Sequence, residues 1–339
     1  MSDRSEPIPG ATSGVDILSE MLRALRLTGG MRYDATLSAP WGFEVPEQKN
    51  RAPFYIVTQG QCLIELAGPG TDGGRPSCGR LAAGDLAMLP MGGPHVLKDA
   101  AGSQVVPFAS FMARANSSGI RPTISHGGDG PSTNLLVGEF RFGSPLTSAA
   151  LVGIDPIIIT RSINDETPPT FEPILRALCR EQRSNLPGSR AATEELVKLL
   201  FIHVLRNEMA RRRREPGSCK GTSLALTFDP SLRGVAELLH RFPEKPWTVA
   251  ALAEEASMSR TSFAVKFTET TGMAPFAYLT HVRMLNAIEL LSTTTYTLEE
   301  IADRVGYGSE AAFSAAFKRE IGVAPGAYRR SRVSVEAGA

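Results

Sequence analysis

The stretch TVAALAEEASMSRTSFAVKF, residues 248–267, has a second copy in TLEEIADRVGYGSEAAFSAAF, residues 297–317. The first four matched positions are 49 residues apart, and after one extra residue in the second copy the other six are 50 apart. Ten matched positions in the same order indicate a duplicated structural unit. The matched pairs are Thr248 and Thr297, Val249 and Leu298, Leu252 and Ile301, Ala253 and Ala302, Ser259 and Ser309, Phe263 and Phe313, Phe267 and Phe317, Gly272 and Gly322, Pro275 and Pro325, and Tyr278 and Tyr328.

Each copy predicts two short helices separated by a tight turn. The threonine that opens a copy and the serine after its turn suit N-cap positions, because a hydroxyl accepts a hydrogen bond from the free N–H groups of a first helical turn. Phe263 and Phe267 lie four residues apart and therefore share one buried helix face, as do Phe313 and Phe317. A helix, a turn and a capped helix form the helix-turn-helix, whose second helix enters the DNA major groove. Two ordinary helical hairpins are the alternative.

Residues 229–330 resemble the DNA-binding domain of the AraC/XylS family of bacterial transcription regulators. The resemblance implies two helix-turn-helix subdomains joined by a long helix, here expected over about 275–291, which would place both second helices one DNA turn apart. The residues that carry it are Ala253-Glu254-Glu255-Ala256, Met258-Ser259-Arg260, Phe263 to Phe267, Gly272-Met273-Ala274-Pro275, Tyr278-Leu279, Arg283-Met284, Ile301-Ala302, Val305-Gly306-Tyr307, Ser309, Phe313, Phe317-Lys318-Arg319, Gly322, Pro325 and Tyr328-Arg329.

The second helix of each copy, called the recognition helix below, is expected to turn one face outward. That face carries Arg260, Thr261, Ser262, Ala264, Val265 and Lys266 in the first copy, and Glu310, Ala311, Ser314, Ala315, Lys318 and Arg319 in the second. Relatives often carry arginine or glutamine at some of the positions where the family resemblance places base contacts, and several of these are alanine or valine in this chain. The positions lie near Thr261, Ala264 and Val265, and near Glu310, Ala311, Ser314 and Ala315. Small apolar side chains contact thymine methyl groups but cannot make bidentate hydrogen bonds to guanine, so we expect T-rich or shape-dependent readout, or a lowered base specificity. Arg260, Lys266, Lys318 and Arg319 are expected to contact phosphates.

Composition limits the classes of function. The chain has 339 residues, enough for two or three domains, and a net charge of +1. Residues 229–330 contain 11 lysines and arginines against 12 aspartates and glutamates, so any electrostatic attraction to DNA must be local. The cysteines, at 62, 78, 179 and 219, are widely spaced, which favours reduced thiols over a disulfide framework or zinc site. With neither an apolar leader nor an apolar run near 18 residues, a soluble cytoplasmic protein is expected.

Residues 15–165 are expected to form a small β-barrel after a flexible tail at 1–14. An amphipathic helix is predicted over 15–27, ended by Gly29 and Gly30. Short apolar runs between turn residues then predict a sandwich or barrel. The predicted strands are Phe54 to Val57, Cys62 to Leu66, Leu86 to Leu89, Val105 to Phe111 and Leu135 to Phe140.

Part of this region resembles the cupin sensor domains of some AraC-type regulators. The resemblance rests on Leu81-Ala82-Ala83-Gly84-Asp85-Leu86, Leu89-Pro90, Gly93-Pro94-His95, Trp41-Gly42-Phe43 and Gly60-Gln61-Cys62. Metal cupins use His-x-His, a glutamate and a later histidine, of which His95 alone is in place. Tyr55 stands where related sensors often carry histidine, and Val137-Gly138 where many carry Cys-Gly. We therefore expect no metal, cofactor or catalytic residue, with Tyr55 and His95 as candidate effector contacts. His126 is expected to be exposed in a glycine-rich loop.

Residues 166–215 predict two helices, over 172–183 and 192–213, followed by a linker at 216–228. The longer helix has an apolar face too broad for a surface helix, so it packs on the barrel, forms a homodimer interface, or does both. The four arginines at 211–214 complement the helix dipole as a solvated face, or contact DNA phosphate next to residues 229–330.

Together these observations predict an α+β protein with a cupin-like barrel (15–165), a helical dimerisation segment (166–215), a linker (216–228), an all-α double helix-turn-helix domain (229–330) and a short tail (331–339). The expected function is a dimeric, cytoplasmic transcription regulator that binds double-stranded DNA and responds to a small effector. The alternatives are a cupin enzyme with a DNA-binding tail, and a regulator whose barrel is only a dimerisation or protein-interaction scaffold.

Overall fold

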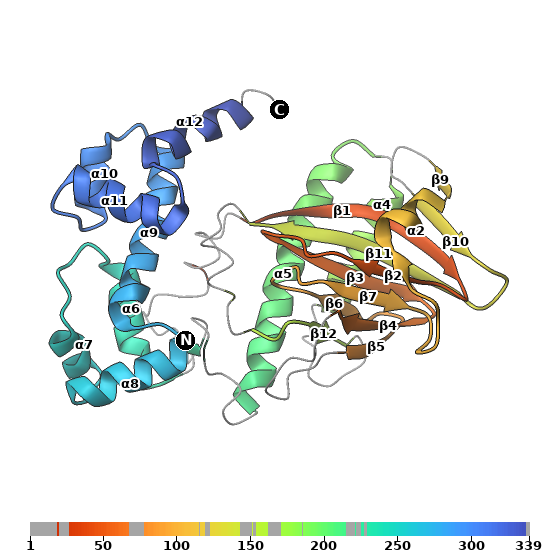
Figure 1. Ribbon diagram of the computed structural model, residues 1–339, viewed down its shortest axis with the longest axis horizontal. Helices are drawn as coiled ribbons and strands as arrows, with labels where there is room; N and C mark the ends of the chain where they lie inside the picture. Colours follow the sequence, from red (N-terminus) through yellow and green to blue (C-terminus); the bar gives the residue numbers. More distant parts are fainter. Residues whose placement is uncertain are drawn as a thin grey trace, which may run out of the picture. The chain divides into compact units, whose positions relative to one another are not determined.

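The computed structural model divides the chain into two compact units (Figure 1). One comprises Leu25–Ala225 with Glu269–Gly272, and the other contains Leu226–Thr268 and Met273–Ala339. The structure describes residues 19, 27–67, 78–114, 116–118, 123–142, 151, 154–161, 171–184, 186–214, 221, 225–226 and 229–336. The tail at 1–14, nearly all of the helix expected over 15–27, and Cys219 lie outside these residues.

The first unit contains two β-sheets in the part of the chain that the structure describes. The larger sheet has the order β12 (Ile158–Thr160), β6 (Leu86–Met88), β3 (Arg51–Gln59), β11 (Ser132–Arg141), β1 (Thr28–Ser38), β10 (Thr123–Gly127) and β9 (Asn116–Ser118). The smaller has the order β5 (Cys78–Ala82), β4 (Gln61–Leu66), β7 (His95–Lys98), β2 (Gly42–Val45) and β8 (Val106–Pro107). The expected β-rich domain is therefore present, as two sheets.

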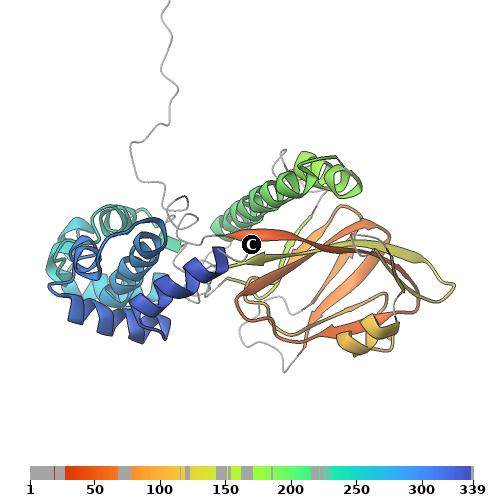
Figure 2. The ribbon, with the colours of Figure 1, turned by 90° about the horizontal axis from the view of Figure 1, so that it is seen from above.

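The two sheets share one hydrophobic core. Strand alternation puts Leu135 and Val137 of β11 into this core, together with Leu97 of the smaller sheet. Phe140, three residues after Val137, faces the other side, where its ring lies 4.9 Å from that of Phe201. Helices α4 (Phe171–Arg183) and α5 (Ser189–Arg214) cover this outer face of the larger sheet (Figures 1 and 2). The predicted packing of the long helix on the β domain is confirmed.

Two glycines that were expected to end a helix lie inside a strand, and one predicted strand of the β domain was wrong at its end. Gly29 and Gly30 lie inside β1, and a side chain at Gly29 would meet Val197 of α5 at 2.7 Å, so the glycine lets the helix approach the strand. The strand predicted to Phe111 ends at Pro107, where helix α2 (Phe108–Arg114) begins. Phe108, Phe111 and Met112 fit this helix because their spacing puts all three on the core-facing side.

The second unit is helical throughout its described elements. They are α6 (Arg233–Arg241), α7 (Val249–Glu255), α8 (Arg260–Thr271), α9 (Pro275–Thr293), α10 (Leu298–Arg304), α11 (Glu310–Ile321) and α12 (Pro325–Glu336). The two predicted helix-turn-helix copies are α7 with α8 and α10 with α11, and the expected long helix between them is α9. Each helix of the described residues is too short or too polar to cross a membrane.

Candidate nucleic-acid interface

The predicted caps set the start of the helices in both copies. The Thr248 hydroxyl accepts from the Ala251 N–H at 3.1 Å, and Ser259 accepts from the Ser262 N–H at 3.2 Å. In the second copy Thr297 forms a full capping box with Glu300, in which each side chain bonds the other residue's backbone N–H. Ser309 accepts from the Ala312 N–H at 3.2 Å. All four caps are confirmed.

The turns between the paired helices have matching backbone hydrogen bonds. In the first, the Met258 N–H donates to the Ala253 carbonyl at 2.9 Å, and in the second the Tyr307 N–H donates to the Ala302 carbonyl at 2.8 Å. These six-to-one bonds close a Schellman motif and fix where each recognition helix begins. The second turn then has one more residue, Gly308, before its serine cap, which accounts for the change in offset from 49 to 50.

Buried aromatic rings hold each recognition helix from behind. On α8, the Phe263 and Phe267 rings are 5.5 Å apart, and Phe267 lies 5.5 Å from Tyr278 of α9. On α11, Phe313, Phe317 and Tyr328 of α12 repeat this arrangement, with distances of 5.6 and 5.7 Å. All four phenylalanines are fully buried, so the opposite face of each helix points outward.

The predicted DNA-reading residues lie on these outward faces. On α8, Arg260, Thr261, Ser262 and Val265 are exposed, whereas Ala264 and Lys266 are half-buried. On α11, Glu310, Ala311, Ala315, Lys318 and Arg319 are exposed and Ser314 is half-buried. The exposed fraction of Val265 is 54%, so its apolar side chain is not used in packing.

The structure adds an acidic neighbour that the sequence did not suggest. Asp229 lies 3.3 Å from the Lys266 ammonium, although the two residues are far apart in the chain. Burial raises the pKa of Asp229, but the hydrogen bonds from Ser231 and the Lys266 charge outweigh it, so the pKa lies below its usual range. Arg319 pairs with Glu320 at 3.1 Å. Two of the four predicted phosphate contacts thus already have carboxylate partners.

The candidate effector residues Tyr55 and His95 contact each other inside the first unit. The Tyr55 hydroxyl lies 2.6 Å from His95 Nε2, and His95 Nδ1 lies 2.7 Å from the Gly93 carbonyl. Because a carbonyl only accepts, Nδ1 carries the proton and Nε2 accepts from Tyr55. Burial lowers the pKa of His95 to about 4, and burial raises the pKa of Tyr55 well above its usual value. The pair is therefore neutral.

Comparison with known proteins agrees with both halves of the chain. A family model described as a cupin matches residues 16–210, and one described as a helix-turn-helix domain matches residues 252–331. A Streptomyces lividans protein named as an AraC-like transcription regulator is 32% identical over 320 residues, covering 93% of this chain and 98% of the relative. The chain belongs to the AraC-type family of transcription regulators.

A second relative matches nearly the whole chain, and a solved structure matches its DNA-binding domain. The regulator AlkR of Acinetobacter baylyi is 31% identical over 93% of this chain and 99% of its own. Among solved structures, the DNA-binding domain of AdpA in complex with a target DNA is 36% identical, covering 33% of this chain and 99% of that one, with a TM-score of 0.31.

The cupin half of this AraC-type regulator shows few groups suited to a metal. Among the described residues, no three histidine, cysteine, aspartate or glutamate side chains lie close enough together to hold a metal ion.

His126 is not in an exposed loop as predicted. It lies on β10, half-buried, with its ring 4.6 Å from that of Phe111. Cys62 is buried, Cys78 is exposed and Cys179 is intermediate.

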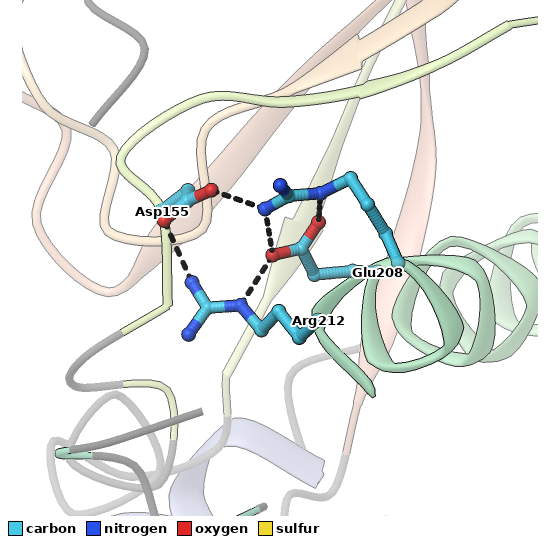
Figure 3. A network of polar contacts seen from close by, with 4 residues as sticks. Asp155, Glu208 and Arg212 are labelled. Carbon is cyan, nitrogen blue, oxygen red and sulfur yellow. Dashed lines mark hydrogen bonds and ion pairs between the residues drawn. The ribbon is translucent and has the colours of Figure 1, made fainter. Parts of the chain in front are cut away.

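The arginine run at the end of α5 corrects another expectation. Arg212 is buried, and it pairs with Asp155 at 2.7 Å and with Glu208 one helical turn earlier. Arg211 pairs with the same two carboxylates (Figure 3). Asp155 lies just before β12, so this network, called the α5 clamp below, ties the end of the helix to the cupin domain. A solvated face was therefore the wrong prediction for Arg212.

Proposed function

We propose that this regulator reads double-stranded DNA with the outward faces of α8 and α11. The observation that carries the proposal is Val265, which is exposed at mid-helix on a capped recognition helix whose opposite face is fully buried. A large apolar side chain left in water at that position suits contact with a thymine methyl group. The base-contacting set is Thr261, Ala264 and Val265 on α8 with Glu310, Ala311, Ser314 and Ala315 on α11.

Four cations flank this set and suit the DNA backbone. Arg260 and Lys318 are exposed at the recognition helices, and Lys266 and Arg319 extend the same surfaces once they leave their carboxylate partners. The Ser262 hydroxyl already takes part in a hydrogen bond at the cap of α8, 2.9 Å from the Ser259 hydroxyl. Phosphate contacts of this kind position the helices without reading sequence.

The test is selection of bound fragments from genomic DNA, followed by footprinting of the best site at two salt concentrations. Protection of two neighbouring major-groove faces per protomer is expected, and a Val265→Ser variant should lose preference at one thymine. A Val323→Ser variant is the matched control, since Val323 is also exposed but lies outside α8 and α11. Protection that disappears by about 200 mM salt for every sequence would contradict base readout.

The homodimer is part of the proposal and rests on α5. Leu200, Phe201 and Val204 are buried within the chain, whereas Leu199 remains 39% exposed on the same helix. A Leu199→Glu variant should shift the protein toward monomer in analytical ultracentrifugation. Leu186→Glu is the control, because Leu186 is 71% exposed and precedes the helix. Unchanged association of the Leu199 variant would place the dimer contact elsewhere.

We further propose that the interior between the two cupin sheets binds a small effector and carries out no catalysis. The protein would act in the cytoplasm, where its DNA target lies. Tyr55 and His95 are the polar groups of this interior offered to a ligand. A second candidate role, as a scaffold only, is favoured by the fact that the two side chains already satisfy each other. Metabolite screening by thermal shift, with metal analysis of the purified protein, separates these roles from a metal-dependent cupin enzyme.

A further inference from the structure

Three arginines converge on one glutamate in the cupin domain. Glu139 of β11 has a nearly buried side chain, 5% exposed. Arg51 of β3 donates to both of its carboxylate oxygens, at 3.0 and 2.9 Å. Arg141 of β11 also pairs with it, and Arg32 of β1 approaches to 3.5 Å. We call these four residues the arginine cluster.

Strand alternation puts the arginine cluster on the inner face of the larger sheet. Glu139 and Arg141 follow the core residue Val137 in steps of two along β11. Arg51 precedes the core residue Tyr55 by four residues on β3. Arg32 is the extra residue at the bulge of β1, and such bulges redirect a side chain. The cluster therefore lies at the end of the same face that carries Tyr55.

The arginine cluster has more positive charge than Glu139 needs. One carboxylate against three guanidinium groups leaves a net charge of +2. Arg51 and Arg141 are also directly opposite in the β3–β11 register, where like charges destabilise a sheet. Their side chains are 40% and 53% exposed, and that of Arg32 is 49% exposed. In the described part of the chain, Glu139 is the one acidic side chain paired with any of them.

Aromatic side chains continue inward from the arginine cluster. Burial raises the pKa of Tyr33 above its usual range, while the nearby Arg32 charge lowers it. The Tyr33 ring stacks on Phe108 at 6.4 Å, and Phe108 lies 5.5 Å from Phe43. A ligand whose oxyanion meets the arginines would direct its body toward apolar rings.

We propose that Arg32, Arg51 and Arg141 bind the oxyanion of the effector, which we assign to the class of small aromatic carboxylates. Arginine suits this role because its planar guanidinium bonds a carboxylate through two parallel N–H groups. In the free protein Glu139 occupies part of the site and competes with the ligand. The inference rests on the proposed effector role of the cupin domain and specifies the chemistry of that effector.

The test uses the full-length protein and benzoate as a probe, measured by isothermal titration calorimetry and thermal shift. Benzyl alcohol is the uncharged analogue, and inorganic phosphate is an oxyanion without the aromatic body. We expect benzoate to bind more tightly than either. The double variant Arg51→Gln/Arg141→Gln should weaken benzoate binding by at least about tenfold and leave any benzyl alcohol binding unchanged. Arg176→Gln is the control, since Arg176 forms an exposed ion pair on α4.

A Glu139→Gln variant keeps the proposal falsifiable if the double variant does not fold. Removing the competing carboxylate should tighten benzoate binding by about tenfold and let benzoate restore the thermal stability that the variant loses. Equal binding of benzoate and benzyl alcohol, or no gain in the Glu139 variant, would overturn the site. Phosphate binding as tight as benzoate binding would overturn the aromatic class.

DNA binding of the same samples separates this inference from the proposed function. Wild-type protein that binds its selected fragments but does not distinguish benzoate from benzyl alcohol would overturn the oxyanion site alone. Protein that binds benzoate through the arginine cluster but fails to bind any selected fragment would overturn the proposed function and support the site.

Discussion

Ser257 occupies the position in the first turn that Gly306 occupies in the second, and both have left-handed backbone conformations, with φ of +53° and +82°. Each is the residue after the cap of its first helix, where the Schellman motif requires this conformation. A side chain at Gly306 would meet the Glu244 carbonyl oxygen at 2.6 Å, so the second turn has no room for one. Ser257 has a Cβ atom, so its left-handed backbone conformation is strained.

Replacing these two residues should have opposite effects on the free energy of unfolding. Ser257→Gly removes the left-handed strain but adds flexibility to the unfolded chain, so we expect a net gain of about 0.5 kcal/mol. Gly306→Ala should cost about 2 kcal/mol or more, because strain and the Glu244 contact add. Chemical denaturation of the second unit measures both. Gly308→Ala is the control, because it has open space around it, and a loss as large as that of Gly306→Ala would refute the explanation.

Because Asp229 pairs with Lys266, removing the Asp229 carboxylate should increase the affinity for DNA. Asp229→Asn frees the Lys266 ammonium for phosphate, so binding should tighten evenly across sequences and the salt slope should steepen by up to about one unit. Lys266→Ala should weaken binding and reduce the slope by about one unit. Fluorescence anisotropy at several salt concentrations measures both. A slope that stays the same in both variants would remove Lys266 from the interface.

The α5 clamp should contribute strongly to the stability of the cupin domain. Asp155→Ala removes one of the carboxylates that pair with the buried Arg212, and removing one member of a buried ion pair typically costs about 3–5 kcal/mol. Glu172→Ala, which breaks the exposed pair with Arg176, should cost less than about 1 kcal/mol. Urea denaturation compares the two variants. Equally small losses of unfolding free energy in the two variants would mean that water can take the place of Asp155 in the α5 clamp.

In each unit, a buried histidine with a strongly lowered pKa should contribute to destabilisation by acid. The pKa of His95 is lowered by burial to about 4, and the pKa of His240 in the second unit is lowered to about 4 by burial and by His281. The unfolded chain takes up these protons near pH 6.5, before the folded protein does. Each of these histidines therefore leaves the free energy of unfolding unchanged above pH 6.5. As the pH falls from 6.5 toward 4, each lowers the free energy of unfolding by about 1.4 kcal/mol per pH unit.

Single variants assign the acid effect to its histidine. His95→Gln should reduce the pH dependence of unfolding in the cupin unit alone, and His240→Gln should reduce it in the helical unit alone. Intrinsic fluorescence can follow both units, since Trp41 lies in the first and Trp247 in the second. A pH dependence that survives in the matching variant would show that other groups cause it.

Sequence predicted the helical unit well because its signals are local. The caps at Thr297 and Ser309 and the buried Phe313 and Phe317 all follow from spacing within one copy. The same holds for which faces of α8 and α11 point outward. The partner of Lys266 is not local, since Asp229 approaches it only after the chain has folded.

The β unit was harder to predict because its features depend on long-range pairing. A Gly-Gly pair usually ends an element, whereas here Gly29 lies inside β1, where Val197 of α5 leaves no room for a side chain. The run of arginines after Met209 looks solvated until Asp155, more than 50 residues earlier, comes within 2.7 Å of Arg212. The arginine cluster likewise combines residues from three strands. The DNA contacts and the effector contacts of Tyr55 and His95 stay predictions.

The small, weakly charged outward faces of α8 and α11 also bear on how the regulator would search a chromosome. Random DNA holds a protein mainly through phosphate neutralisation. Residues 229–330 contain 12 acidic residues against 11 basic ones, and two of the interface cations are paired in the free state. Non-target sites, which number in the millions, would then retain few molecules. Under the proposed readout, a low number of copies per cell would suffice to occupy an operator, and occupancy would change quickly when the copy number changes.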